Sequence, residues 1–201
     1  MSRRTHEGDD SHLQWESLDS ETIYDARIFR LRSVRRRSVE GRSAPFVSVD
    51  APDWVTVIPE MPAVDDGAPD FLIVRQFRHG TERVGLEFPA GVIDPGESPE
   101  SAAARELLEE TGYRAGELRR IGAVSPNPAF MTNITYTYLA RDLQKVSDRL
   151  NLDEHEILDV HTVGFEELRT KMGDDPYDSA ITVQAWFLYL KAAGYLPGGP
   201  S

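Results

Sequence analysis

A helix whose two ends are both marked in the sequence lies near the middle of the chain. The segment "SPESAAARELLEETG" (98–112) predicts a helix over residues 99–111. Ser98 is a favourable N-cap, because its hydroxyl can accept a hydrogen bond from a free N–H of the first turn. Pro99 suits the first helical position, and Gly112 suits the left-handed position that ends many helices. The position and length of this helix are therefore specified locally.

Glutamates gather on one face of the predicted helix. At 3.6 residues per turn, Glu106, Glu109 and Glu110 are neighbours. The two alanines one turn earlier, at positions 102 and 103, are expected to leave room beside these carboxylates. The opposite side of the helix carries Ala104, Leu107, Leu108 and Thr111.

Two interpretations of this acidic face stay open on the residues alone. A solvated surface helix needs no ligand, and the i, i+4 pair of Arg105 with Glu109 supports it. However, like charges at this spacing destabilise a helix, and Arg105 is the single basic residue between Ser98 and Gly112. Clustered carboxylate oxygens are what Mg²⁺ or Mn²⁺ prefers. The second interpretation is therefore a site for a divalent cation.

Strand-like segments flank this helix on both sides. Runs rich in β-branched and aromatic residues cover 21–49, 54–61, 71–77, 84–93, 118–126, 134–143 and 155–163. Further helices are predicted over 165–172 and 179–195, with Asp178 as the N-cap of the second. Strands and helices in mixed order favour an α/β or α+β sandwich. The expected organisation is a disordered tail (1–18), N-terminal strands (19–52), a main domain (53–195) and a mobile tail (196–201).

Composition excludes several classes of function. The 201 residues include no cysteine, which rules out disulfides, thiolate nucleophiles and zinc–cysteine sites. The net charge of −12 argues against nucleic acid as a partner, although a basic run, "RLRSVRRR" (30–37), is expected to form a strand face or an interface. No apolar run is long enough for a membrane span, and the N-terminus does not read as a secretory signal. These features predict a cytoplasmic protein with no membrane partner.

The glutamates belong to a longer pattern that resembles a known signature. Its residues are Gly91, Glu97, Arg105-Glu106-Leu107, Glu109-Glu110 and Gly112-Tyr113. This spacing resembles the signature of the Nudix hydrolase superfamily, with every defined position filled. The flanking segments "VRQFRHG" and "LEFPAG", together with Pro128, are similar to the ADP-ribose and ADP-sugar pyrophosphatase branch. The resemblance implies an α/β/α sandwich with a mixed sheet and a small N-terminal β-sheet extension.

The resemblance also implies a reaction. Members of this branch hydrolyse the pyrophosphate bond of a nucleoside diphosphate sugar with the help of a divalent metal ion. ADP-ribose, which would give AMP and ribose 5-phosphate, is the leading substrate, and GDP-mannose or another nucleotide sugar is the alternative. A third possibility is a nucleotide-sensing module that does not cleave its ligand. Such a module would be expected to have lost carboxylates of the signature, and all of them are present here.

By resemblance, the metal would be Mg²⁺, with Mn²⁺ as the alternative. Glu106 and Glu110 would be the main ligands and Glu109 a supporting one. The backbone carbonyl of Ala90 and the carboxylate of Glu97 would complete the site. Arg105 would orient the acidic side chains by ion pairing.

Other members of the expected site come from loops. A carboxylate in "LDEHEILDV" (152–160) would position the attacking water or act as the general base. Glu154 and Glu156 are the candidates, and Glu154 has the slightly better loop position. The expected substrate contacts are Arg75, Arg78, Gly91, Phe130 and Met131. Finally, strands over 21–49 are expected to form a dimerisation sheet, so that the protein would be a homodimer.

Overall fold

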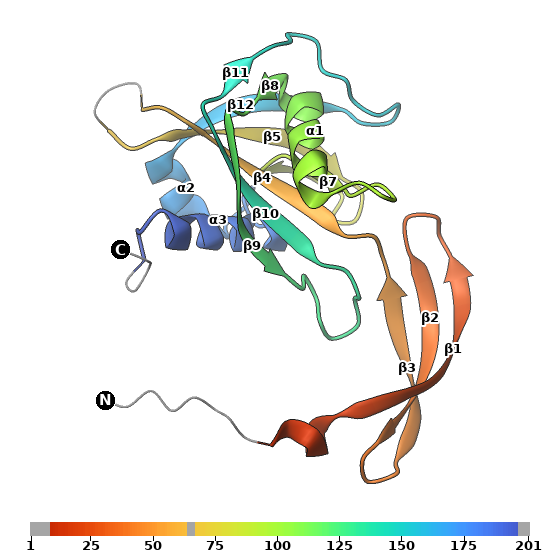
Figure 1. Cartoon of the computed structure of the whole chain (residues 1–201). Coiled ribbons are helices and arrows are strands. Elements are labelled where there is room, and N and C mark those ends of the chain that lie inside the picture. Colours follow the sequence, from red (N-terminus) through yellow and green to blue (C-terminus); the bar gives the residue numbers. More distant parts are fainter. Residues whose placement is uncertain (1–8, 64–66, 197–201) are drawn as a thin grey trace, which may run out of the picture. The chain divides into compact units, whose positions relative to one another are not determined.

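The computed structural model describes residues 9–63 and 67–196, which fall into two compact units (Figure 1). The first contains residues 9–51 and 127–132, and the second contains the remainder. Residues 1–8 of the predicted disordered tail (1–18) lie outside the described residues. Beyond it the prediction is wrong, because a short 3₁₀ helix, η1 (Asp10–Leu13), is followed by the start of a strand. Of the predicted mobile tail, only residue 196 is described.

The first unit is a three-stranded antiparallel sheet in the order β1 (Trp15–Asp25), β2 (Arg30–Ser38) and β3 (Ser43–Asp50). Segment 127–132 follows the free edge of β3, where the N–H of Val49 donates to the carbonyl of Phe130 (2.7 Å). The predicted strand face of residues 30–37 is present. Its arginines pair with acids across the sheet, because Arg30 binds Asp25 (3.0 Å) and Arg35 binds Asp19.

The second unit contains a seven-stranded mixed sheet. Its main path runs β12-β5-β4-β10-β9, with β6 paired to β5 and β7 paired to β4. Only β4 and β10 are parallel. β4 and β5 pair with each other at one end alone, through Glu60–Met61 and Asp70–Phe71. The strand bounds are β4 (Trp54–Met61), β5 (Asp70–Arg78), β6 (Arg83–Glu87), β7 (Ala90–Val92), β9 (Glu117–Val124), β10 (Thr135–Arg141) and β12 (Leu158–Gly164).

Two residues each from β8 (Tyr113–Arg114) and β11 (Gln144–Lys145) form a small separate ladder that the sequence did not predict. β12 begins at Leu158, so the predicted strand over 155–163 starts three residues too early. Residues 155–157 instead belong to the loop that precedes the strand. This loop becomes important for the site, because it carries Glu156.

Helices cover both faces of the large sheet. On one face, α1 (Pro99–Thr111) packs Ala102, Ala103 and Leu107 against Val55 and Val57 of β4. On the other face lie α2 (Phe165–Lys171) and α3 (Ala180–Ala192). Alternate residues of β4 therefore serve different layers, as the period of a strand requires. The predicted α/β/α sandwich with a mixed sheet is confirmed.

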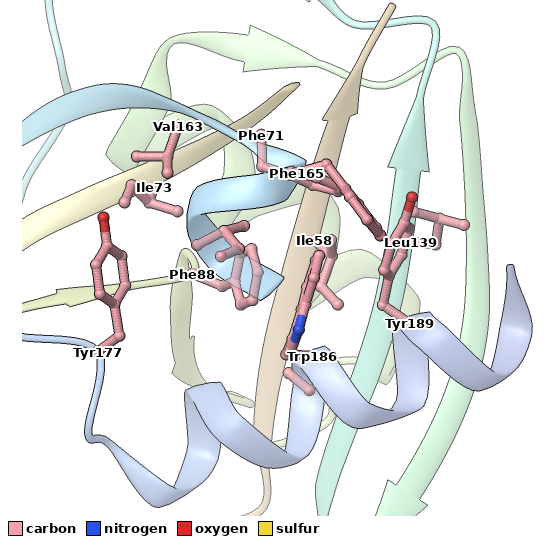
Figure 2. Packing of buried hydrophobic residues seen from close by; sticks show 12 residues of the cluster. Ile58, Phe71, Ile73, Phe88, Leu139, Val163, Phe165, Tyr177, Trp186 and Tyr189 are labelled. Atoms are coloured by element: carbon pink, nitrogen blue, oxygen red, sulfur yellow. The ribbon is translucent and has the colours of Figure 1, made fainter. Parts of the chain in front are cut away.

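The larger core lies on the α3 side and is rich in aromatic rings (Figure 2). The ring of Phe71 meets Trp186 and Tyr189 edge-on, with centroids 5.4 and 5.0 Å apart. Such packing is favoured by the ring quadrupoles. Ser179, not the predicted Asp178, is the cap residue, because α3 begins at Ala180. The carboxylate of Asp178 binds Arg83 (2.7 Å). This core fixes the sheet that carries the candidate site.

The orientation of α1 differs from the prediction. Its ends are as predicted: the hydroxyl of Ser98 accepts the N–H of Ser101 (3.1 Å), and Gly112 has φ of 76°. However, Ala104 is exposed, whereas the buried residues are Ala102, Ala103, Leu107, Glu110 and Thr111. The two alanines expected to clear space are core residues, and one glutamate shares the buried face. The acidic side is thus turned toward the sheet.

No helix in the described part of the chain is long and apolar enough to cross a membrane.

Candidate active site

Four carboxylates gather where α1 faces β7 and the loop before the helix. They are called the acidic cluster below and consist of Glu97, Glu106, Glu109 and Glu110. Glu110 is the most enclosed of them, with 2% of its surface exposed. Its carboxylate accepts a hydrogen bond from the backbone N–H of Ala90 (3.0 Å). This contact ties the last turns of the helix to β7.

Arg105 connects most of the acidic cluster. Its guanidinium binds both carboxylate oxygens of Glu97 (3.0 and 2.9 Å). One terminal nitrogen also donates to Glu106 (2.6 Å) and Glu109 (3.1 Å), and the other donates to the carbonyl of Val92 (2.9 Å). The ion pairs predicted for Arg105 are therefore present. Its planar fork holds three carboxylates that would otherwise repel one another.

Gly91 allows the close approach of Glu106 to β7. A Cβ atom at position 91 would overlap the carboxylate group of Glu106. The signature needs glycine here because a side chain would not fit. Its backbone conformation is not the reason, since its φ lies outside the left-handed region. Any larger residue there would have to push Glu106 away from the acidic cluster.

The environment of the acidic cluster changes the acidity of its members in opposite directions. Burial raises the pKa of Glu110 well above 4.5, and the charges of Glu156 and Glu106 add to this effect. Burial also raises the pKa of Glu106, although Arg105 opposes it. In contrast, the hydrogen bonds from Arg105 lower the pKa of Glu97. Two glutamates are therefore held in an environment that disfavours their charge unless a cation compensates it.

The loop before β12 brings Glu156, and not Glu154, to this region. The side chain of Glu156 accepts a hydrogen bond from the amide of Gln76 (3.0 Å), and its charge acts on both Glu106 and Glu110. Glu154 is exposed. The slight preference for Glu154 that its loop position suggested is therefore not supported by its exposure, and the catalytic role of either residue stays a prediction. A backbone hydrogen bond from the N–H of Glu156 to the carbonyl of Asp153 (3.0 Å) closes the turn that carries both residues.

The same loop is attached to α1 through its backbone. The N–H of Asn151 donates to the carbonyl of Glu109 (3.2 Å), and the N–H of Val146 donates to that of Gly112 (2.9 Å). These bonds use carbonyls that the helix leaves free at its C-terminal end. The path of the chain between β10 and β12 is thereby fixed relative to the acidic cluster.

Of the two arginines proposed as substrate contacts, Arg78 reaches the site and Arg75 does not. Arg78 binds both oxygens of Glu87 (3.0 and 3.2 Å), and its charge acts on Glu110 and Glu156. Burial lowers the pKa of Arg78, but the hydrogen bonds and charge of Glu87 outweigh this, so that its pKa is raised overall. Arg75 is exposed on the other face of β5.

Phe130 and Met131 belong to the first unit, with segment 127–132. They line a cavity of about 480 Å³ together with residues of the small sheet, including Trp15, Arg36 and Phe46. The rings of Trp15 and Phe46 meet edge-on, with centroids 5.2 Å apart. The expected substrate contacts of Phe130 and Met131 stay predictions, since they lie in a different unit from the acidic cluster.

The donor set of the acidic cluster fits a hard divalent cation. It offers carboxylate oxygens and no sulfur or imidazole, the chemistry that Mg²⁺ and Mn²⁺ prefer. Within residues 9–63 and 67–196, no three acidic or histidine side chains already converge at metal-binding distance. The carboxylates of Glu106, Glu109 and Glu110 accept hydrogen bonds from Arg105 and from the N–H of Ala90 instead. The metal-ligand roles of Ala90, Glu97 and the three helix glutamates stay predictions.

Three residues at the site were not singled out for it from the sequence. Gln76 and Glu87 contact Glu156 and Arg78, and Asn151 contacts Glu109. For Gln76 and Glu87 a signal existed, because both lie in the segments "VRQFRHG" and "LEFPAG" that carry the resemblance. For Asn151 there was no such signal, since only the path of the loop brings it to the helix.

Comparisons with known proteins agree with this geometry. The family model described as "NUDIX domain" matches residues 61–182. The chain is 32% identical over 182 residues to an ADP-ribose pyrophosphatase of Bacillus subtilis, covering 90% of this chain and 96% of the relative. It is 34% identical over 181 residues to an ADP-sugar pyrophosphatase of Mus musculus, covering 87% and 79%.

Among solved structures, an ADP compounds hydrolase superposes with a TM-score of 0.76 at 30% identity, covering 91% of this chain and 97% of that chain. The family match extends over more than half of the chain, and it includes the whole acidic cluster. The chain therefore belongs to the Nudix family.

Proposed function

We propose that the protein is a Nudix hydrolase that cleaves the pyrophosphate bond of ADP-ribose or a related ADP-sugar, in the presence of a divalent cation. One observation supports this proposal: every carboxylate of the signature is present in the acidic cluster, and the charges of Glu156 and Arg78 act on Glu110. The relatives named as ADP-ribose and ADP-sugar pyrophosphatases support the substrate class.

The residues divide into groups by chemistry. The acidic cluster and the backbone of Ala90 would hold the cation, for which we propose Mg²⁺, with Mn²⁺ as an alternative. When bound, such an ion neutralises charge on pyrophosphate oxygens and makes water more acidic. Arg78, which Glu87 holds in place, offers a fixed guanidinium to a phosphate. Glu156 positions the attacking water and accepts its proton, because it is a carboxylate next to the cluster without a hydrogen bond from Arg105.

A substrate panel tests the proposed reaction. The protein is incubated with Mg²⁺ and ADP-ribose, ADP-mannose, GDP-mannose or UDP-glucose, and a phosphatase then releases phosphate from the products. We expect ADP-ribose or ADP-mannose to turn over fastest. Preference for GDP-mannose would move the substrate to another nucleotide sugar. Absence of turnover on every member, with nucleotide binding retained by calorimetry, would identify a sensing module instead.

Replacement of Glu110 tests the metal assignment. Glu110→Gln keeps the size of the side chain and removes its charge. We expect kcat to fall by about 10²-fold or more, because a carboxylate ligand is lost. Glu100→Gln is the matched control, since Glu100 lies exposed on the same helix, and it should keep wild-type turnover. A wild-type kcat for Glu110→Gln would show that Glu110 is not an essential metal ligand.

We also propose that the first unit forms a homodimer. Tyr24, Leu31 and Val49 are directly opposed on the three strands, so they share one face of the sheet. Val47 lies on the same face, and the side chains of Tyr24 and Val47 are more than half exposed. These side chains form an apolar patch at one end of a face that also carries the ion pair of Arg35 with Asp19. An exposed apolar patch bordered by polar residues is a typical contact surface.

Light scattering tests the dimer. We expect twice the mass of the chain for the wild type and the mass of one chain for the double variant Tyr24→Ser/Val47→Ser. A monodisperse monomer of the wild type at micromolar concentration would contradict the proposed homodimer. The proposed compartment is the cytoplasm, on the cysteine-free sequence, and fractionation of the source cells would check it.

A further inference from the structure

An amide side chain contacts Glu156 from the neighbouring strand. Gln76 lies near the end of β5, where its backbone pairs with Leu158 of β12 on one side and Gly85 of β6 on the other. Its Nε2 donates to a carboxylate oxygen of Glu156 (3.0 Å). Its other polar atom, Oε1, is buried and has no hydrogen-bond partner among the described residues. Because burying a polar atom without a partner is costly, the hydrogen bond to Glu156 is the interaction that this amide gains here.

Glu156 needs an attractive partner to stay where it is. Its charge lies near enough to those of Glu106 and Glu110 to raise the pKa of both, so the three carboxylates repel one another. The next residue along the loop, Ile157, is 85% exposed, so the loop borders solvent. A carboxylate in this position would gain hydration by turning outward, because like charges at short range disfavour the inward position. The hydrogen bond from Gln76 opposes that movement.

The backbone of Gln76 is held more firmly than that of Glu156. Gln76 pairs with a neighbouring strand on each side. Glu156 lies in a loop, where its N–H donates a hydrogen bond to the carbonyl of Asp153 (3.0 Å). Arg78, two residues further along the same face of β5, adds a favourable charge but donates its hydrogen bonds to Glu87. Gln76 is therefore the residue that sets the direction of the Glu156 carboxylate.

We propose that Gln76 is a positioning residue for the reaction: its amide holds the Glu156 carboxylate against the acidic cluster. This inference rests on the role proposed above for Glu156. It assigns to Gln76 no contact with substrate or cation. Its effect on turnover passes through Glu156 alone, and this distinguishes it from a residue that merely supports the end of β5.

A double-mutant cycle measures that dependence. The variants are Gln76→Leu, Glu156→Gln and the double variant, assayed with ADP-ribose and Mg²⁺ for kcat and KM separately. We expect Gln76→Leu to lower kcat about tenfold with KM within about twofold. Glu156→Gln should lower kcat by about 10²-fold or more. The double variant should equal Glu156→Gln within about twofold, because Gln76 has nothing left to position.

Two further variants separate positioning from folding. Gln76→Glu has the same shape but places a second carboxylate against Glu156, so kcat should fall below that of Gln76→Leu. Gln184→Leu is the matched control: the Nε2 of Gln184 on α3 is also buried with no partner in the part of the chain that the structure describes, and this variant should keep wild-type kcat. Thermal unfolding of each variant checks that the fold persists.

The outcomes are distinguishable. Losses that multiply in the double variant, wild-type kcat in Gln76→Leu, or wild-type kcat in Glu156→Gln would each overturn the inference while the hydrolase activity stands. A Gln76→Leu protein that is unfolded, together with a folded Gln76→Glu variant of wild-type kcat, would do the same. No turnover by the wild type on any nucleotide sugar would overturn the proposed function and this inference together.

Discussion

The guanidinium of Arg105 donates two hydrogen bonds, of 3.0 and 2.9 Å, to the carboxylate of Glu97, which lies eight residues earlier in the sequence. This pair joins the middle of α1 to the loop that enters the helix. The same guanidinium also reaches Glu106 and Glu109, so that one cation balances three neighbouring carboxylates. In the protein without added cations, much of the local stability of the acidic cluster should therefore depend on Arg105.

Removal of Arg105 tests that dependence. We expect Arg105→Ala to lower the free energy of unfolding by about 2 kcal/mol in EDTA, because the partly buried carboxylates lose their hydrogen-bonded partner. Mg²⁺ should reduce this loss if it takes over the charge balance. Arg169→Ala, which breaks an exposed pair with Glu166, is the control and should leave the free energy of unfolding nearly unchanged, because solvent screens this pair. Urea titrations with and without Mg²⁺ give both values, and equal losses for the two variants would contradict the expectation.

The raised pKa of Glu110 predicts how stability depends on pH. Burial first, and then the charges of Glu156 and Glu106, raise this pKa well above 4.5. Above pH 4.5 the unfolded chain releases this proton before the folded protein does. The contribution of Glu110 to the free energy of unfolding is therefore complete below pH 4.5 and falls as the pH rises toward the folded-state pKa.

Comparison with Glu110→Gln isolates this contribution, since the other groups titrate in both proteins. In EDTA, the stability of Glu110→Gln relative to the wild type should increase from pH 4.5 upward, with a slope of at most about 1.4 kcal/mol per pH unit. Urea unfolding at intervals from pH 4.5 to 8 measures the difference. A difference that stays constant with pH would show that burial does not raise this pKa.

Gly91 should be intolerant of any side chain. Gly91→Ala places a Cβ where the carboxylate of Glu106 now lies, so that Glu106 must move. We expect kcat for ADP-ribose to fall about 10²-fold, since small displacements of catalytic groups have effects of this size. Gly80→Ala is the control, because a Cβ at that position meets no atom within 4 Å and its φ is unstrained. Similar activity of the two variants would contradict the tight approach of Glu106 to β7.

Arg78 and Arg75 should respond differently to the same conservative change. Arg78→Lys keeps the positive charge opposite Glu87 but loses the paired hydrogen bonds that hold the guanidinium. We expect kcat/KM for ADP-ribose to fall about tenfold. Arg75→Lys, on the exposed face of β5, should change it less than about twofold. Steady-state kinetics measure kcat/KM for both variants, and equal effects would mean that Arg78 does not contact a phosphate.

Much of the fold was predictable because it depends on short-range patterns. α1 begins and ends as predicted, since Ser98 caps its first turn and Gly112 takes the left-handed conformation that stops it. Strands β4, β5 and β10 were found from their apolar, β-branched runs. The face that α1 buries agrees with the sequence pattern only in part, because Leu107 and Thr111 are buried but Glu110 is buried with them. Ala102 and Ala103 are inside and Ala104 is outside, because the position of the sheet, rather than the helix alone, selects the face.

The sequence by itself determined the end points of α1, the spacing of its glutamates and the family to which the chain belongs. These are local properties, set by caps and by neighbours three and four residues apart. Only the tertiary structure decided that the charge of Glu156 acts on the acidic cluster and that Gln76 contacts Glu156 from 80 residues away. It also decided that the charge of Arg78 acts on Glu110, whereas Arg75 lies exposed on the other face of β5. Such choices depend on strand pairing and on the path of a loop, and neither leaves a periodic trace in the amino-acid sequence.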